Sequence, residues 1–374
     1  NLNDAMSLVD DQLDLAVRWL GEERTVVCAL LIDAEGSSPF APGAFMLIDG
    51  EGAIEGSITG GCVESDVVVN ALEMVEGDHA PRVLTYGVSD AAAHEVGLMC
   101  GGTVDVFVQE LAGEARGVCL EAYEAAARGV TTGIATLVDG GAAGAKLAVL
   151  DGRTIGGMRG PELLDHSVTR DLAALSERGT SALRHYGEEG QALGSGVTVH
   201  LQAFRPAPRL VLVGAIDYSA AVAALARQAG YEVVIADARE AFARSARFSR
   251  VATVHVGQPG PAIEERELGP RDAVIVFSHD SKFDEPAILA ALRSDAGYIG
   301  ALGSHRTARD REGRLIEAGA SAEDLARLHS PCGLDIGAAT PEEVAISIMA
   351  EVIAARSGRA GRPLLTIEES IRPR

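Results

Sequence analysis

The spacing of hydrophobic and polar positions divides the chain near residue 205. Up to residue 204, short apolar runs alternate with turn-forming residues and with segments of helical spacing, which predicts hairpins and helices in an α+β arrangement. Beyond residue 205, runs rich in Val, Ile and Ala are each followed by a helical segment, a pattern typical of a parallel sheet. The sequence therefore predicts two domains, 1–204 and 205–374, joined by a proline-containing linker at 205–208.

The first domain contains one series of elements twice. In the first copy we expect, in chain order, a helix at 3–20, a strand at 26–32, a hairpin at 45–50 and 53–58, a helix at 63–75, and strands at 83–86 and 103–108. In the second copy a helix at 119–128 precedes strands at 133–139, 144–149, 155–158 and 197–202. The recurrence predicts an internal duplication, with repeats at about 1–112 and 113–204.

Two segments of the first repeat place a cysteine beside a pair of glycines. They are 59–64, which contains Gly60, Gly61, Cys62 and Glu64, and 97–102, which contains Cys100, Gly101 and Gly102. Glycine pairs permit sharp turns and the close approach of a ligand, because no Cβ stands in the way. The second repeat has Leu163 and Leu193 at the places of the two cysteines, and it lacks the insertions near 36–42 and 88–96. We therefore predict that the two segments line one site.

The side chains of this predicted site suit soft-metal or sulfur chemistry. A cysteine thiolate binds soft metals or carries sulfur, so Cys62 and Cys100 are candidate catalytic residues and metal ligands. Glu64, at the predicted helix start, is a candidate proton carrier; alternatively its carboxylate only stabilises the first helical turn. The two cysteines could instead be small buried side chains, which is what we expect of Cys28 and Cys119. Their spacing matches no standard zinc finger.

The second domain has the βαβ spacing of a dinucleotide-binding fold. A buried strand at 210–214 ends in Gly214, a helix follows to about residue 229, and the next strand ends at Asp237, 23 residues after Gly214. An acidic residue at this distance is typical of a ribose contact. Ile216, however, stands where the second glycine of the fingerprint would let the backbone approach the pyrophosphate. The pattern predicts a Rossmann-like, doubly wound parallel sheet with weak binding of NAD(P).

The loops at the carboxyl ends of parallel strands form the ligand crevice of such sheets. Those that follow the predicted strands at 273–277 and 297–300 contain His279 and, at the start of a helix, Ser304 and Arg306. Free N–H groups at a helix start beside an arginine can bind a phosphate, which makes these three residues candidates for cofactor binding. The alternative is that they are ordinary surface residues.

Composition narrows the classes of function. A net charge of −22 argues against nucleic acid and anionic membranes as partners. No apolar run reaches about 18 residues, so we expect no membrane span. Acidic residues among the first twenty positions argue against a signal peptide. Five cysteines in 374 residues argue against a disulfide framework. We therefore expect a cytoplasmic protein.

Four long motifs follow one another along the chain. They are Gly-Gly-Cys-Val-Glu at 60–64, Val-Gly-Leu-Met-Cys-Gly-Gly at 96–102, Gly-Ala-Leu-Gly-Ser at 300–304 and Gly-Leu-Asp-Ile-Gly-Ala at 333–338. In these motifs and their order the chain resembles the xanthine dehydrogenase accessory (XdhC/CoxI) family over nearly its whole length. The resemblance implies a maturation factor that holds the molybdenum cofactor, helps equip it with a terminal sulfur and delivers it to a xanthine dehydrogenase-type molybdoenzyme. Cys62, Glu64 and Cys100 fall on the motif positions of the family.

The resemblance also implies a homodimer, and it makes a cysteine desulfurase a candidate partner. Two alternatives stay open. One is an NAD(P)-dependent oxidoreductase that uses the second domain, an interpretation that Gly214 and Asp237 favour and Ile216 disfavours. The other is a structural partner of the dehydrogenase without a ligand of its own. Whether the chain is itself an enzyme is left open by the sequence, although an accessory role fits the motifs better.

Overall fold

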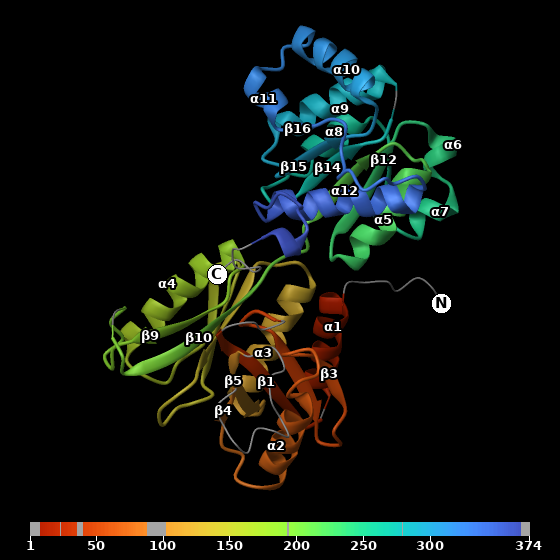
Figure 1. The fold of residues 1–374 in the computed structure, drawn as a ribbon. Coiled ribbons are helices and arrows are strands. Elements are labelled where there is room, and N and C mark those ends of the chain that lie inside the picture. The colour runs from red at the N-terminus through yellow and green to blue at the C-terminus, as the bar shows by residue number, and fades with distance from the viewer. Residues whose placement is uncertain are drawn as a thin grey trace. The chain divides into compact units, whose positions relative to one another are not determined.

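The computed structural model describes residues 8–22, 24–35, 40–87, 102–192, 194–278 and 280–367. The chain forms two compact units: one is Val9–Pro206, and the other consists mainly of Ala207–Arg374 (Figure 1). Two antiparallel sheets build the first unit and one parallel sheet builds the second. The predicted fold class, an α+β domain followed by a Rossmann-like domain, is therefore confirmed.

The first sheet and its helices come from the first predicted repeat. In chain order the elements are α1 (Leu8–Gly21), β1 (Val26–Glu35), β2 (Phe45–Asp49), β3 (Ile54–Gly56), α2 (Glu64–Glu76), β4 (Arg82–Tyr86) and β5 (Thr103–Glu110). The strand order is β3-β2-β1-β5-β4. Helix α2 covers one face of this sheet, because Val67, Ala71 and Met74 recur at helical spacing and are buried against it.

The second sheet has the same strand order. Its elements are α3 (Gly113–Ala127), β6 (Thr132–Leu137), β7 (Lys146–Leu150), β8 (Arg153–Gly156), α4 (Glu162–Arg178), β9 (Ala182–Tyr186) and β10 (Val197–Phe204). The order is β8-β7-β6-β10-β9, so each strand has a counterpart in the first sheet, and α4 is the counterpart of α2. We refer to these halves as repeat one and repeat two. Their matching topology supports the duplication proposed from the sequence.

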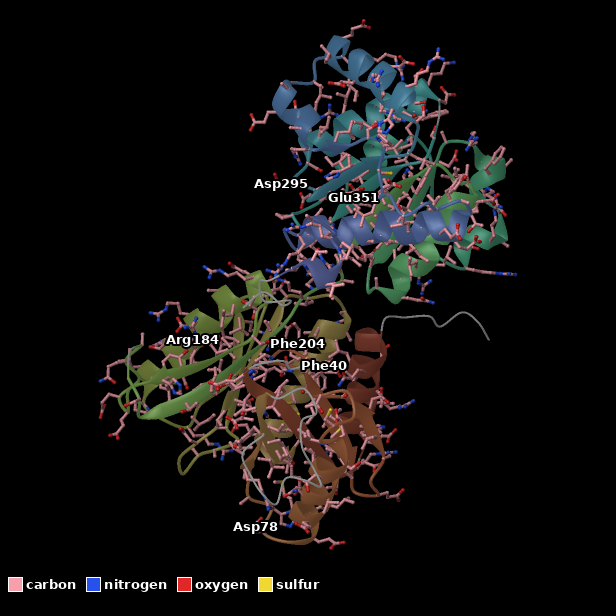
Figure 2. The ribbon with its side chains drawn as sticks, in the orientation of Figure 1. Phe40, Asp78, Arg184, Phe204, Asp295 and Glu351 are labelled. Carbon is pink, nitrogen blue, oxygen red and sulfur yellow. The ribbon has the colours of Figure 1, made fainter. Side chains whose placement is uncertain are left out.

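The two repeats share a core and a pair of reciprocal hydrogen bonds. Phe45 stacks on Tyr123, with ring centroids 5.4 Å apart, and Phe204, labelled in Figure 2, packs edge-on against both rings. Nε2 of Gln109 in β5 donates to the carbonyl oxygen of Gly144 in repeat two at 2.8 Å. Nε2 of Gln202 in β10 donates to the carbonyl oxygen of Gly43 in repeat one, also at 2.8 Å. The repeats are thus joined with approximate two-fold symmetry.

The second unit is a six-stranded parallel sheet of order β13-β12-β11-β14-β15-β16. Its strands are β11 (Arg209–Val213), β12 (Glu232–Asp237), β13 (Thr253–Val256), β14 (Ala273–Val276), β15 (Tyr298–Ala301) and β16 (Leu328–His329). Its helices are α5 (Asp217–Gln228), α6 (Glu240–Ala243), α7 (Ala246–Ser249), α8 (Pro259–Glu264), α9 (Ser281–Arg293), α10 (His305–Glu317), α11 (Ala322–Ala326), α12 (Pro341–Arg356) and the 3₁₀ helix η1 (Leu364–Thr366). Helices α5 and α12 pack on one face, and α8, α9 and α10 on the other. This is the doubly wound strand order of dinucleotide-binding folds.

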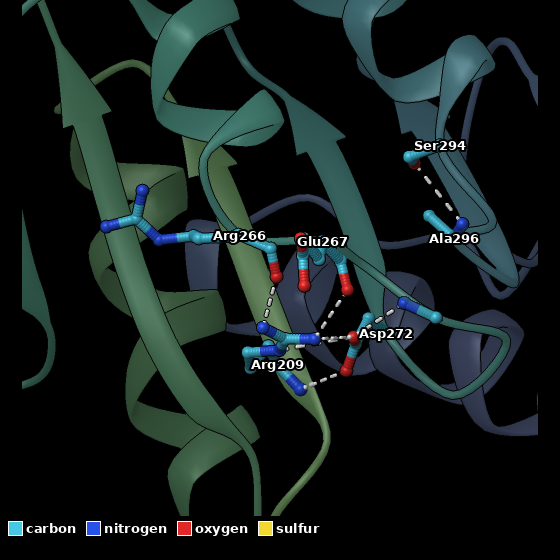
Figure 3. Close-up of polar contacts among 7 residues, drawn as sticks. Arg209, Arg266, Glu267, Asp272, Ser294 and Ala296 are labelled. Carbon is cyan, nitrogen blue, oxygen red and sulfur yellow. Dashed lines mark hydrogen bonds and ion pairs between the residues drawn. The ribbon is translucent and has the colours of Figure 1, made fainter.

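An ion pair anchors the beginning of the central strand of this sheet. Nε and Nη2 of Arg209 donate to Asp272 Oδ2 at 3.2 and 2.9 Å, and the backbone N–H of Arg209 donates to Oδ1 at 2.7 Å (Figure 3). The same guanidinium also donates to the carbonyl oxygens of Arg266 and Glu267. These bonds lie at the amino ends of the strands, away from the ligand crevice, and hold the sheet together. Among the described helices, none is long and apolar enough to cross a membrane.

Candidate functional site

The loops of repeat one that follow β1, β3 and β4 lie at the same end of its strands. Glu35, the last residue of β1, pairs with Thr103, the first residue of β5. The last residue of β4, Tyr86, pairs with Val104, and the last of β3, Gly56, pairs with the second residue of β2. The loop 57–63 and the buried Gly102 therefore lie at the same edge. Cys100 and Gly101 lie outside the described residues, so their predicted place in this site is untested.

The loop 57–63 is folded around the side chain of Glu64, the first residue of α2. Seven groups donate hydrogen bonds of 2.6–3.2 Å to the carboxylate: to Oε1 the Ser57 hydroxyl and the backbone N–H groups of Ile58, Thr59 and Gly60, and to Oε2 the Thr59 hydroxyl and the N–H groups of Gly61 and Val63. A chain can turn its N–H groups toward one point in this way because Gly60 and Gly61 have φ values of 81° and 109°. The glycine pair thus serves the wrapping of Glu64.

The hydrogen bonds decide the ionisation state of Glu64. Burial alone would raise the pKa of this carboxyl group, but the bonds from Ser57 and Thr59 outweigh burial and lower the pKa to about 2. A group with this pKa carries no proton near neutral pH. The geometry therefore favours the second sequence interpretation, in which Glu64 stabilises the local fold. Its carboxylate also uses the N–H groups that an anionic ligand would otherwise find in this loop.

Cys62 lies in this loop, between Gly61 and Val63. Its side chain is half-buried and packs at the margin of the core under α2. A Cβ placed on neighbouring Gly61 would meet no atom within 4 Å, whereas one on Gly60 would lie 3.5 Å from the ring of Phe40. There is consequently open space beside the Cα atom of Gly61, the residue that precedes Cys62. No group of three or more His, Cys, Asp or Glu side chains suited to a metal occurs in the part of the chain that the structure describes.

Two other cysteines of this unit belong to the core, as the sequence predicts. Cys28 in β1 and Cys119 in α3 are buried. Burial raises the pKa of both thiols, that of Cys28 to about 12. Neither is a thiolate near neutral pH. Cys62 is therefore the accessible thiol of the described first unit.

Repeat two has no counterpart of the wrapped carboxylate among its described residues. Asp165, at the place of Glu64, accepts one backbone hydrogen bond, from Met158 N–H at 2.8 Å. Leu163, at the place of Cys62, is 51% exposed. The positions match, but the polar loop and the thiol occur in repeat one. Leu193 lies outside the described residues.

In the second unit the residues of the dinucleotide fingerprint form hydrogen bonds with one another and with their neighbours in the chain. Gly214 has φ 103°, as the tight turn requires. Oδ2 of Asp237, the predicted ribose ligand, accepts from Ala215 N–H at 2.7 Å and from Arg239 Nη2 at 2.7 Å, and Oδ1 accepts from Arg239 N–H and Nε. Burial would raise the pKa of Asp237, but its bonds to Arg239 and Ala215 lower it. Ile216 precedes α5 at its N-cap. A ribose would have to compete with Arg239.

At the predicted anion site, the start of α10, fewer polar groups are bonded within the protein. Ser304 is the N-cap residue, and its hydroxyl oxygen accepts from Thr307 N–H at 3.2 Å. Arg306 is exposed in the first turn of this helix. His279 lies outside the described residues. The structure thus places Ser304 and Arg306 together at a helix start. Buried Arg311, further along α10, donates to Ser330 Oγ and to the Leu302 carbonyl oxygen, and its Nε has no hydrogen-bond partner among the described residues.

Sequence reasoning missed a polar cluster beside Tyr298, the first residue of β15. Glu351 of α12, labelled in Figure 2, accepts from the Tyr298 hydroxyl and from Gly333 N–H, both at 2.6 Å, and its other oxygen lies 3.0 Å from His329 Nδ1. Burial would raise the pKa of Glu351, but the bonds from His329 and Tyr298 lower it to about 2. The sequence signal that could have revealed the cluster is the 333–338 motif, because its first residue, Gly333, donates to Glu351. The cluster fixes this motif against the sheet.

Comparisons with known proteins give a consistent result. Residues 19–87 match the family model described as the XdhC and CoxI family, and residues 210–352 match that of the XdhC Rossmann domain. The chain is 29% identical over 344 residues to a protein of Bacillus subtilis (strain 168) named as a probable xanthine dehydrogenase subunit, covering 90% of this chain and 95% of that protein. It is 26% identical over 361 residues to the "Molybdenum cofactor insertion chaperone PaoD" of Escherichia coli (strain K12), covering 93% and 90%. A crystal structure described as a xanthine dehydrogenase from Bacillus halodurans has the same fold, with a TM-score of 0.71 and 24% identity over 96% of this chain and 98% of that one.

Proposed function

Because this chain belongs to the XdhC and CoxI family, we propose that it binds the molybdenum cofactor and delivers it to a xanthine dehydrogenase-type molybdoenzyme. Two relatives that align over nine-tenths of the chain support this role by their names. One is named as part of a xanthine dehydrogenase, and the other as a molybdenum cofactor insertion chaperone. The proposal makes the protein a maturation factor that acts on another enzyme.

The observation that carries the proposal is the presentation of Cys62. Cys62 is half-buried and follows Gly61, whose Cα faces open space, on a loop that Glu64 holds with seven hydrogen bonds. A thiolate is a ligand that soft metals prefer, and a rigid loop holds it in place at little entropic cost. The donor set therefore fits one contact to molybdenum. When bound, the molybdenum centre would supply the atom that accepts the terminal sulfur.

Each residue of the site has a separate proposed task. Cys62 contacts the cofactor at or near the metal, and Cys100 is proposed as a second contact on the same edge. Gly60 and Gly61 let the loop close around the carboxylate, and Glu64 orders the loop. Proton transfer by Glu64 finds no support in a pKa of about 2. Sulfur insertion, a cysteine desulfurase partner and a homodimer stay predictions of the family resemblance.

The test is cofactor retention measured on matched variants. We expect Cys62→Ser to lower the molybdenum retained after anaerobic gel filtration at least about tenfold, equivalent to about 1.4 kcal/mol of binding. Activation of an apo-form molybdoenzyme should fall in parallel. The melting temperature should move by less than about 2 °C, because a half-exposed hydroxyl keeps its hydration.

Leu163→Ser in repeat two is the matched control and should leave retention and activation intact. Cys100→Ser tests the second proposed contact in the same assay. A Cys62→Ser protein that melts lower but retains and delivers cofactor normally would show that Cys62 is a core residue. That outcome would remove the site assignment.

The oxidoreductase alternative gains no support from the second unit, because Asp237 is engaged by Arg239 and Ala215. Weak NAD(P) binding stays a prediction, with a dissociation constant no tighter than about 100 μM, or roughly −5.5 kcal/mol. Titration calorimetry that gives low-micromolar binding would contradict it.

A further inference from the structure

A pocket of about 130 Å³ opens in the first unit, on the repeat-two side of the seam between the repeats. It is lined by Gln109, Ala112, Glu114, Ala115, Ala143, Gly144, Ala145, Lys146 and Arg159. None of these residues belongs to the loop that presents Cys62. By register, Gly144 and Lys146 occupy the places of Gly43 and Phe45 of repeat one. The pocket thus lies in repeat two at the position where repeat one carries the apolar side chain of Phe45.

The pocket wall contains a buried cation without a carboxylate partner among the described residues. Lys146 is 5% exposed, and its Nζ donates to Thr136 Oγ1 at 2.9 Å. The same cross-strand row continues to His200, which is fully buried and has no hydrogen-bond partner at either ring nitrogen within the described ranges. Burial and the charge of Lys146 lower the pKa of His200 to about 3, so this imidazole is neutral. Lys146 therefore retains donors and a positive charge that nothing described there neutralises.

A buried acceptor lies in the same wall. Nε2 of Gln109 is used by the Gly144 carbonyl, which fixes the orientation of the amide. Its Oε1 is buried and accepts no hydrogen bond from the described part of the chain. A buried polar atom without a partner costs about 1–3 kcal/mol, so a ligand that donates to it is favoured.

The mouth of the pocket is formed by the start of α3. Ala112 is its N-cap residue and supplies no side-chain cap, and Ala112, Glu114 and Ala115 line the pocket. The leading N–H groups of a helix have no acceptor within the helix, and they attract anions. Arg159 stands at the same mouth, 3.0 Å from Glu114. The pocket therefore combines Lys146, the N–H donors of the helix start and the acceptor of Gln109 with the ion pair of Arg159 and Glu114 at its mouth.

We propose that this pocket binds a protonated phosphate group, either free or as the end of a phosphomonoester. The phosphate oxygens accept from Lys146 and from the N–H groups of α3, and the remaining P–OH donates to Oε1 of Gln109. An ionised carboxylate or sulfate has no proton for this last contact. The site goes beyond the proposed cofactor function and does not depend on it.

The experiment measures thermal stabilisation and calorimetric binding with the full chain free of molybdenum cofactor, at about pH 6.5 and constant ionic strength, where phosphate monoesters keep part of their protonation. We expect inorganic phosphate to bind at least about tenfold more tightly than sulfate, a difference of about 1.4 kcal/mol. Glycerol 3-phosphate distinguishes the sources: binding comparable to that of phosphate identifies a monoester site, and its absence identifies a site for free phosphate.

Lys146→Met should remove phosphate binding while the protein stays folded, because Met replaces an uncompensated buried charge with a side chain of similar length. Ala115→Leu should also remove it by filling the pocket without touching a hydrogen bond. Arg153→Ala, which removes an exposed cation of repeat two paired with Glu121, is the charge-matched control and should bind normally. The proposal fails if wild-type protein does not bind phosphate, if sulfate binds equally well, or if both pocket variants still bind phosphate.

Discussion

Repeat one and repeat two have the same strand order and place their polar groups in opposite parts of it. Repeat one concentrates polarity in the loop around Glu64, at the edge of its sheet. In the row of paired positions that faces the seam it is apolar: Phe45, Leu30 and Phe107. In the matching loop of repeat two, Asp165 accepts a single described hydrogen bond. At the paired positions that face the other repeat, repeat two has Lys146, Thr136 and His200. A shared backbone therefore supports two different arrangements of polar groups, and side chains at matched positions decide which one forms.

The largest difference between the repeats should appear on removal of the loop carboxylates. Glu64→Ala leaves seven donors without their acceptor, so we expect a loss of about 3–5 kcal/mol in the free energy of unfolding. Asp165→Ala removes the acceptor of one described N–H group and should cost about 1 kcal/mol. Urea unfolding of both variants measures the ratio, and equal losses would contradict the assigned role of the loop.

The same carboxylate gives the comparison a pH dependence. The folded pKa of Glu64, about 2, lies below the ordinary value of 4.5. Its stabilisation is therefore complete above pH 4.5 and is lost as the pH falls toward 2. Unfolding measured across this window should show a component in the wild type and in Asp165→Ala that Glu64→Ala lacks.

Substitutions at the paired positions that face the other repeat should change stability in the opposite direction. Lys146→Met removes a buried cation that has no described acidic partner, so we expect a gain of about 1–3 kcal/mol in stability. Phe45→Met at the matched position loses the ring stacking on Tyr123 and should cost about 1 kcal/mol. Thermal melts decide the signs, and a destabilised Lys146→Met protein would mean that the charge is compensated.

The reciprocal glutamines test how symmetric the seam is. Gln109→Leu and Gln202→Leu each remove one hydrogen bond to a glycine carbonyl, and each should cost about 1 kcal/mol. Because Oε1 of Gln109 has no described partner, we expect the loss at 109 to be the smaller. Denaturant midpoints at equal m-values report both losses.

The smallest effect should come from Leu163. It matches the half-buried Cys62 and is itself 51% exposed, so it does not pack in a core. Leu163→Ala should therefore change stability by less than about 0.5 kcal/mol. A loss above about 2 kcal/mol would indicate that another surface covers this residue in solution.

The fold class and the buried strands followed from the sequence, because strands such as β11 and β14 carry apolar runs. Helix α4 and strand β9 were not predicted; β9 is mostly unburied and carries no apolar run. The prediction for α3 began too late, at residue 119, because the weakly amphipathic start at Gly113 contributes little hydrophobic signal. Cys62 was predicted from its contrast with Leu163. The role of Glu64 was not, since a carboxylate at a helix start has the same sequence signature whether it binds seven donors or none.

Side-chain partners across the seam could not be predicted either. The pairing of Gln109 with Gly144 joins residues of different repeats, and no local pattern specifies it. Asp237 stood at the ribose position, but Arg239, two residues later, takes its oxygens. Sequence spacing predicts that a residue lies at the end of a strand, but its hydrogen-bond partner depends on which side chains the folded backbone brings near it.

The crossed glutamine bonds also bear on how the molecule could have arisen. In a dimer of two identical chains, each with one repeat, a single glutamine codon would encode both bonds. Every substitution would then appear in both halves of the dimer. With the halves fused in one chain, codons 62 and 163 can change separately while the bonds persist. A thiol in one half with a leucine at the matched position of the other half is a combination that two identical chains cannot have, so covalent fusion is what allows a side chain present once per pair of halves to be inherited.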